Sequence, residues 1–251
     1  MKPPKCDLGY ARIRNAISAV RLSSLDVHVW SVLLDDLFER GSTFTGALTA
    51  TEIAWMERSV ASLEQQRQIM TRGLLRFILS LYLEVVPAAV TIEFETRRPQ
   101  LLGDFDKSLR FNSSTSESEA MFAVARNREV GIELALQREV DEEMLYSSAQ
   151  LTPGERNLLA LMPPGNRSTA FYRLQARRCA LAKAKNAELA MAATAGGGVT
   201  HWAPLSHLSF GRATVGRWTV QDIDAPAGYA SALAAENDDW QMQHIRLVAA
   251  K

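Results

Sequence analysis

Cysteine is scarce in this sequence, with only Cys6 and Cys179 among 251 residues. Two cysteines do not make the disulfide framework of a small secreted domain, so we expect a reducing compartment, the cytoplasm. A net charge is also absent, because 28 basic residues balance 28 acidic residues. The sequence therefore gives no general attraction to nucleic acid or to an anionic membrane surface.

Long apolar runs are missing as well. The most apolar stretch, residues 73–90, is interrupted by Arg76, Glu84 and Pro87, whereas a membrane-spanning helix needs roughly 20 apolar residues. The first 15 residues contain no apolar segment of the kind found in signal peptides. We therefore expect neither a membrane partner nor export.

What is present is the composition of a globular protein, with 47% apolar and 22% charged residues. Residues 27–33 and 90–94 have the β-branched character of strands. Between them, Thr49-x-x-Glu52 forms a capping box that opens a helix, and a second helix is expected over 65–83. The first half of the chain thus predicts a strand, a helix pair and a further strand.

The second half of the chain predicts the same order of elements. Strands are expected over 120–125 and 130–134, as a pair joined across 126–129. Thr152-x-x-Glu155 is another capping box, and a long helix follows over 168–188. The remaining strands are expected over 212–223, 229–235 and 243–248.

The two helix pairs share one spacing. Thr49 precedes Arg76 by 27 residues, and Thr152 precedes Cys179 by 27 residues. This repeat predicts an α+β fold of two duplicated halves related by a pseudo-twofold axis, with a ligand-binding cleft between them. The alternative is coincidence, because capping boxes are common. We expect an N-terminal arm over 1–25, a first half over 26–115 and a second half over 116–251.

Spacing alone points to few residues that could react or bind a ligand. Cys179 follows Arg177 and Arg178, and cationic neighbours lower the pKa of a thiol. No histidine is linked to Cys179 by a motif, so a packed small side chain is the alternative to a nucleophile. Arg72 and Arg76 are expected on one helix face, either gripping a phosphate or lying in a solvated basic stripe.

A series of motifs, taken in order, follows a family pattern. An early strand carries Trp30, a basic helix runs over 71–83, and Arg97-Arg98-Pro99 comes next. The central motifs are Phe111-Asn112-Ser113-Ser114-Thr115-Ser116 and Val130-Gly131-Ile132-Glu133-Leu134-Ala135, before the helix segment 175–183, QARRCALAK. Over residues 27–248 the sequence resembles the Sfp-type 4′-phosphopantetheinyl transferases, whose fold is a pseudo-twofold pair of α+β halves.

The resemblance implies transfer of phosphopantetheine from coenzyme A to a carrier-protein serine, with magnesium held by three carboxylates. The corresponding positions here are Glu133, Ala135 and Cys179, so one carboxylate remains. Glu133 is the implied metal ligand, and Glu133, Cys179 and Lys183 are the implied catalytic residues. The residues implied to bind coenzyme A are Arg72, Arg76, Arg98, Ser114, Thr115, Arg178 and Lys183.

Three functions follow from this pattern. The first is a degenerate family member that binds coenzyme A, pantetheine or a carrier protein in a fatty acid, polyketide or nonribosomal peptide pathway, without ordinary magnesium-dependent transfer. The second is an active transferase whose metal ligands have moved, with Glu117 or Glu119 assisting Glu133. The third is an acyl-transfer enzyme that uses Cys179 as its nucleophile. We expect a monomer with an acyl or peptidyl carrier protein as its partner.

Overall fold

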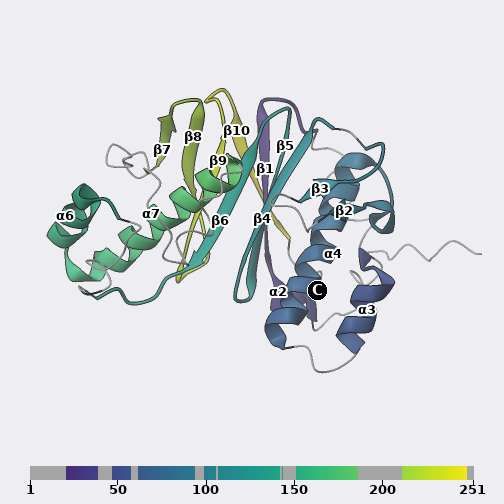
Figure 1. Ribbon diagram of the computed structural model, residues 1–251, viewed down its shortest axis with the longest axis horizontal. Coiled ribbons are helices and arrows are strands. Elements are labelled where there is room, and N and C mark those ends of the chain that lie inside the picture. The colour runs from purple at the N-terminus through teal and green to yellow at the C-terminus, as the bar shows by residue number, and fades with distance from the viewer. Residues whose placement is uncertain are drawn as a thin grey trace, which may run out of the picture.

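Two four-stranded sheets lie between two long helices, in the order helix, sheet, sheet, helix (Figure 1). The structure is a computed structural model and describes the residue ranges 21–38, 47–57, 62–93, 99–105, 107–141, 143, 151–185 and 211–247. The mixed α and β composition agrees with the α+β class expected from the sequence. No helix in these ranges is both long enough and apolar enough to cross a membrane.

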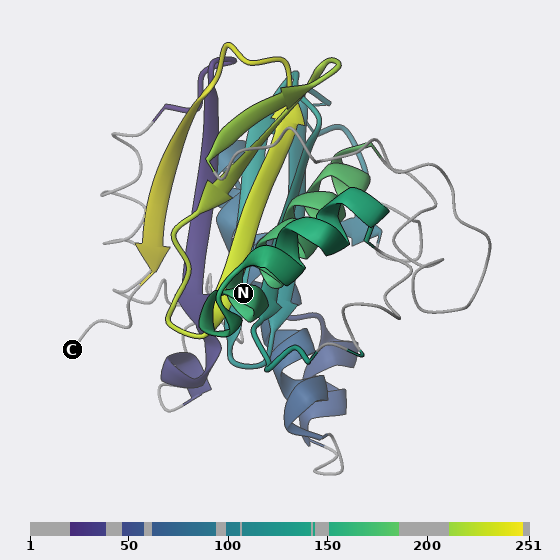
Figure 2. The ribbon, with the colours of Figure 1, turned by 90° about the vertical axis from the view of Figure 1, so that its left-hand side faces the viewer.

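The first sheet has the strand order β10-β1-β5-β4. Its strands are β1 (Asp26–Leu33), β4 (Leu109–Ser116), β5 (Glu119–Arg126) and β10 (Gln241–Leu247). Strand β5 runs antiparallel to both β1 and β4, whereas β10 runs parallel to β1. The last strand therefore returns to the sheet that the first strand began, and Figure 2 shows it at the outer edge.

The second sheet has the order β6-β9-β8-β7 and is antiparallel throughout. Its strands are β6 (Val130–Leu136), β7 (Arg212–Val215), β8 (Trp218–Ile223) and β9 (Tyr229–Glu236). The range 212–223, expected as one strand, is a hairpin of β7 and β8. A separate two-stranded sheet pairs β2 (Ile92–Glu93) with β3 (Gln100–Leu101).

In the described part of the chain, helices follow the leading strand of each sheet, three α-helices after β1 and two after β6. After β1 come α2 (Leu34–Phe38), α3 (Ala50–Glu57), α4 (Leu63–Leu83) and the 3-10 turn η2 (Pro87–Ala89). After β6 come α6 (Pro153–Leu161) and α7 (Pro164–Ala184). Both predicted capping boxes form: Glu52 N–H donates to Thr49 Oγ1 at 3.2 Å, and Glu155 N–H donates to Thr152 Oγ1 at 3.3 Å.

Alternation along the strands explains the layering. Trp30 and Val32 of β1 pack against α4, whereas Val27 and Val29 pack against the second sheet. Successive side chains of a strand point to opposite faces, so β1 contributes to two cores. A third core forms where α7 covers β8 and β9. Burial on both faces is the reason that β5 has a nearly continuous apolar sequence.

Strand pairing corrects one sequence expectation. The strands expected over 120–125 and 130–134 were to pair with each other, but β5 pairs with β1 and β4 while β6 pairs with β9. The chain passes from the first sheet to the second at residues 127–129, between β5 and β6. Hydrophobic runs identify strands but do not specify which strand lies beside which.

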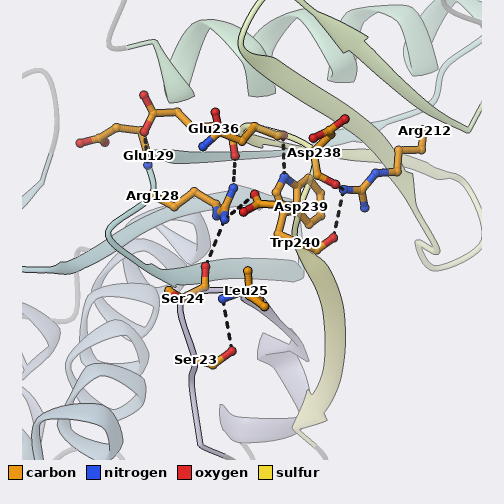
Figure 3. Close-up of polar contacts among 11 residues, drawn as sticks. Ser23, Ser24, Leu25, Arg128, Glu129, Arg212, Glu236, Asp238, Asp239 and Trp240 are labelled. Atoms are coloured by element: carbon orange, nitrogen blue, oxygen red, sulfur yellow. Dashed lines mark hydrogen bonds and ion pairs between the residues drawn. The ribbon is translucent and has the colours of Figure 1, made fainter.

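One buried arginine holds the connection between β5 and β6, where the chain passes from the first sheet to the second. Arg128, which is 5% exposed, donates to the carbonyls of Glu236 and of Ser24, the latter at 3.1 Å. Its guanidinium also lies 2.8 Å from a carboxylate oxygen of Asp239 (Figure 3). Arg128 therefore joins the β5–β6 connection to the β9–β10 connection and to the segment before β1.

Candidate functional site

Strands β4 and β6 meet side by side, although they belong to different sheets. The Asn112 side-chain carbonyl accepts a hydrogen bond from the Ile132 N–H at 3.2 Å, and Ser114 Oγ accepts one from the Leu134 N–H at 3.1 Å. Residues two apart on a strand point the same way, so Asn112 and Ser114 both face β6. These side chains satisfy backbone donors that a neighbouring strand would otherwise pair. Asn112 and Ser114 of the predicted 111–116 motif thus join β4 to β6, and this contact between the two sheets is called the β4–β6 seam below.

Helix α7 approaches β6 closely at Gly131. A Cβ atom on Gly131 would lie 2.2 Å from the Ala180 carbonyl oxygen and 2.4 Å from the Ala184 backbone nitrogen. Only glycine leaves room for this approach. The contact brings the helix segment that contains Cys179 and Lys183 over the seam.

The ammonium group of Lys183 is the centre of a polar cluster at this seam. Its Nζ lies 2.6 Å from Glu133 Oε2, 3.3 Å from the Ser113 carbonyl oxygen and 3.1 Å from the Ile132 carbonyl oxygen. Ser114 Oγ donates to the same Glu133 Oε2 at 3.3 Å. The structure therefore brings together three residues predicted for the site, and the side chains of Glu133 and Lys183 are only 20% and 28% exposed.

Cys179 lies beside this cluster but is a poor nucleophile. Burial, together with the negative charge of Glu133, raises the pKa of its thiol to about 11, against smaller opposing effects of Lys183 and Arg178. Arg178 does lower this pKa, as expected of a cationic neighbour, but burial outweighs that effect. A thiol with this pKa is protonated near neutral pH, and the thiolate is the reactive form.

A magnesium ion fits this donor set poorly. Magnesium prefers hard oxygen ligands in octahedral geometry, but Glu133 is the single carboxylate among the three corresponding positions. Ala135 has no donor atom, Cys179 offers a protonated sulfur, and the Lys183 ammonium already contacts Glu133. Among the described residues, no group of three histidine, cysteine or acidic side chains is placed to hold a metal.

Glu117 and Glu119, considered above as relocated metal ligands, lie at the turn between β4 and β5 and at the start of β5. Glu117, at the β4–β5 turn, is 3.7 Å from Arg67 and 4.0 Å from Arg138. Glu119 is buried at the start of β5, and burial raises its carboxyl pKa.

Two predicted phosphate-binding arginines are held in buried ion pairs. Arg76 of α4 donates to both oxygens of Glu52, at 2.7 and 3.1 Å, and Arg178 of α7 pairs with Glu155. Burial alone would raise the pKa of Glu52, but hydrogen bonds from Arg76 and Thr49 outweigh it and lower that pKa. The structure therefore places these arginines between helices. Sequence reasoning missed their partners, which are the glutamates of the two capping boxes.

The remaining predicted residues lie along α4 and the end of β4. Arg72 is exposed and lines a shallow pocket of 190 Å³ together with Thr51, Glu52 and Ile69. Thr115 is also exposed, and its Oγ1 lies 3.2 Å from Thr71 Oγ1. It borders a pocket of 230 Å³ whose other lining residues are Glu64, Arg67, Gln68 and Glu117. Arg98 lies outside the described residues.

Comparison with known proteins adds one relative. No protein-family profile matches the chain. The chain is 30% identical over 183 residues to the 4′-phosphopantetheinyl transferase HetI of Nostoc sp.. The match covers 69% of this chain and 77% of that protein.

Proposed function

Because the chain belongs to the 4′-phosphopantetheinyl transferase family, we propose that it binds coenzyme A or a pantetheine-bearing carrier protein at the β4–β6 seam, without ordinary magnesium-dependent transfer. The observation that carries this proposal is the 2.6 Å ion pair between Glu133 and Lys183. The pair occupies the one carboxylate that remains, and the two other positions hold an alanine and a protonated thiol.

Exposed polar groups on α4 and at the end of β4 suit the phosphopantetheine arm. Thr115 offers an exposed hydroxyl beside a 230 Å³ pocket, and Arg72 is an exposed cation on the adjoining helix. A guanidinium contacts phosphate through paired N–H groups, so Arg72 is the described residue that we assign to a coenzyme A phosphate. Arg76 and Arg178 have no such role in this proposal, because their guanidinium groups hold Glu52 and Glu155.

We also propose that the two halves are a duplication that creates this seam. The order β1-β5-β4 in one sheet matches β6-β9-β8 in the other, and the helix pairs α3-α4 and α6-α7 lie between the leading strand and the two others. Each capping-box glutamate pairs with an arginine of the following long helix. Asn127 and Asn237 repeat a turn: both have positive φ, and each N–H bonds to the residue that precedes the partner strand.

A working transferase is the second candidate, favoured by the 30% identity to a protein of that activity. In this alternative, Glu133 releases Lys183 and binds magnesium together with substrate phosphates and water. The two candidates differ in whether a carrier protein gains phosphopantetheine.

The test is an incubation of the purified protein with coenzyme A, magnesium and a panel of apo carrier proteins, read by intact mass. We expect no mass gain, and we expect calorimetry to show binding of coenzyme A or of a holo carrier. Arg72→Ala should weaken that binding roughly 10-fold or more, as expected for loss of a charged hydrogen bond. Arg217→Ala, on an exposed arginine of the β7–β8 turn, is the matched control.

A phosphopantetheine mass gain that disappears in Glu133→Ala would establish the working transferase and refute the first candidate. Absence of both mass gain and binding, alongside an active family member as a positive control, would refute both candidates. Equal binding by Arg72→Ala and Arg217→Ala would remove Arg72 from the site.

A further inference from the structure

The surroundings of the Lys183 ammonium resemble those of a bound cation. Three oxygen atoms converge on Nζ: Glu133 Oε2 and the carbonyl oxygens of Ser113 and Ile132. An ammonium group has three N–H donors, so all three are used. The oxygens come from β4 and from β6, while the lysine reaches them from α7.

We propose that Lys183 is a built-in cation of the β4–β6 seam. Its ammonium group neutralises Glu133 and joins two strands that no backbone ladder connects. A small cation that bound here would meet the same carboxylate and the same two carbonyl groups. The seam of this chain therefore carries its own positive charge and requires no free metal ion.

In the unmodified protein the Lys183 ammonium group occupies the space between these three oxygens. Removal of that group should therefore leave a site that binds a free cation. In Lys183→Ala, one carboxylate oxygen and two carbonyl oxygens would face the space left by the side chain, with Ser114 Oγ beside them. Such a set of oxygens attracts a small cation. In Lys183→Met, by contrast, an uncharged side chain of similar length fills the space and leaves no room for an ion.

The experiment measures melting temperatures in the full-length chain. We expect Lys183→Ala to melt about 4–8 °C below the unmodified protein, the scale of a partly buried ion pair in a chain of this size. Methylammonium chloride should recover at least half of this loss in a saturable manner. Sodium chloride at equal ionic strength serves as the reference, because salt itself screens charge.

Three variants make the result specific. Lys183→Met should be destabilised without recovery, and the double variant Lys183→Ala, Glu133→Gln should lose the recovery. Lys185→Ala changes an exposed lysine at the end of the same helix and should behave like the unmodified protein. An unchanged melting temperature in Lys183→Ala, or equal recovery in Lys183→Met, would overturn the proposal.

A measurement on the unmodified protein covers the case in which Lys183→Ala does not fold. Magnesium and EDTA should both leave its melting temperature unchanged. A saturable rise with magnesium that Glu133→Gln abolishes would show a metal displacing the ammonium, and the proposal would fail. This role of Lys183 is independent of coenzyme A binding, because every readout is taken without coenzyme A.

Discussion

Gly131→Ala is the sharpest test of how the site is assembled. The added Cβ atom would lie 2.2 Å from the Ala180 carbonyl oxygen and 2.4 Å from the Ala184 backbone nitrogen. Both atoms belong to the backbone of α7, so a side-chain rotation does not relieve the contact. The helix has to move away from β6 by about an ångström or more, since non-bonded heavy atoms are comfortable near 3.5 Å. That movement also draws Lys183 away from Glu133.

Overpacking by one methyl group costs typically 1–3 kcal/mol. Because two rigid backbone atoms are involved here, we expect a loss of about 3 kcal/mol in the free energy of unfolding. Urea denaturation followed by tryptophan fluorescence measures it, provided that the slope with denaturant stays constant. Gly165→Ala in the first turn of the same helix is the control, because its added Cβ would meet no atom within 4 Å. That substitution should be neutral or slightly stabilising. If both variants unfold at the same urea concentration, the close approach of α7 to β6 does not govern stability, and the assembly described for the site is wrong.

Three further predictions concern buried or partly buried groups. Glu155→Gln should lower the free energy of unfolding by about 3–5 kcal/mol, because it leaves the Arg178 charge buried without its carboxylate; a thermal or urea midpoint close to that of the unmodified protein would contradict this. Cys179 should react with iodoacetamide about 100-fold more slowly than an ordinary thiol at neutral pH, since a pKa of about 11 instead of 9 reduces the thiolate fraction by that factor. Mass spectrometry measures the rate of labelling, and labelling at the rate of a free thiol would refute the protonated state. His28 is fully buried, and burial lowers its pKa below 6.5, so the folded state binds fewer protons than the unfolded state. The free energy of unfolding should therefore fall as the pH drops below about 6.5. His28→Gln should flatten the pH dependence of the urea midpoint between pH 7.5 and pH 5, and an equally steep fall in that variant would assign the effect to other groups.

The sequence by itself determined the local elements and the family. Capping boxes at Thr49 and Thr152 act through atoms only three residues apart, so their geometry follows from the local sequence. The strands at 26–33 and 229–236 were predictable for a related reason, because their apolar and β-branched residues suit burial in a sheet. The order of short motifs likewise carried the resemblance to the transferase family, which the relative at 30% identity supports.

The tertiary structure alone decided what each charged residue contacts. Glu52 lies 24 positions from Arg76 and Glu155 lies 23 positions from Arg178, so no local pattern announces either ion pair. A much larger separation in sequence hid the pairing of β5 with β1 and the return of β10 to the first sheet. The sequence shows that Lys183 is a cation and that Glu133 is a carboxylate, but it does not show that they form a salt bridge. Only the packing of α7 on the β4–β6 seam brings the two groups together, because a salt bridge depends on distances that folding of the chain sets.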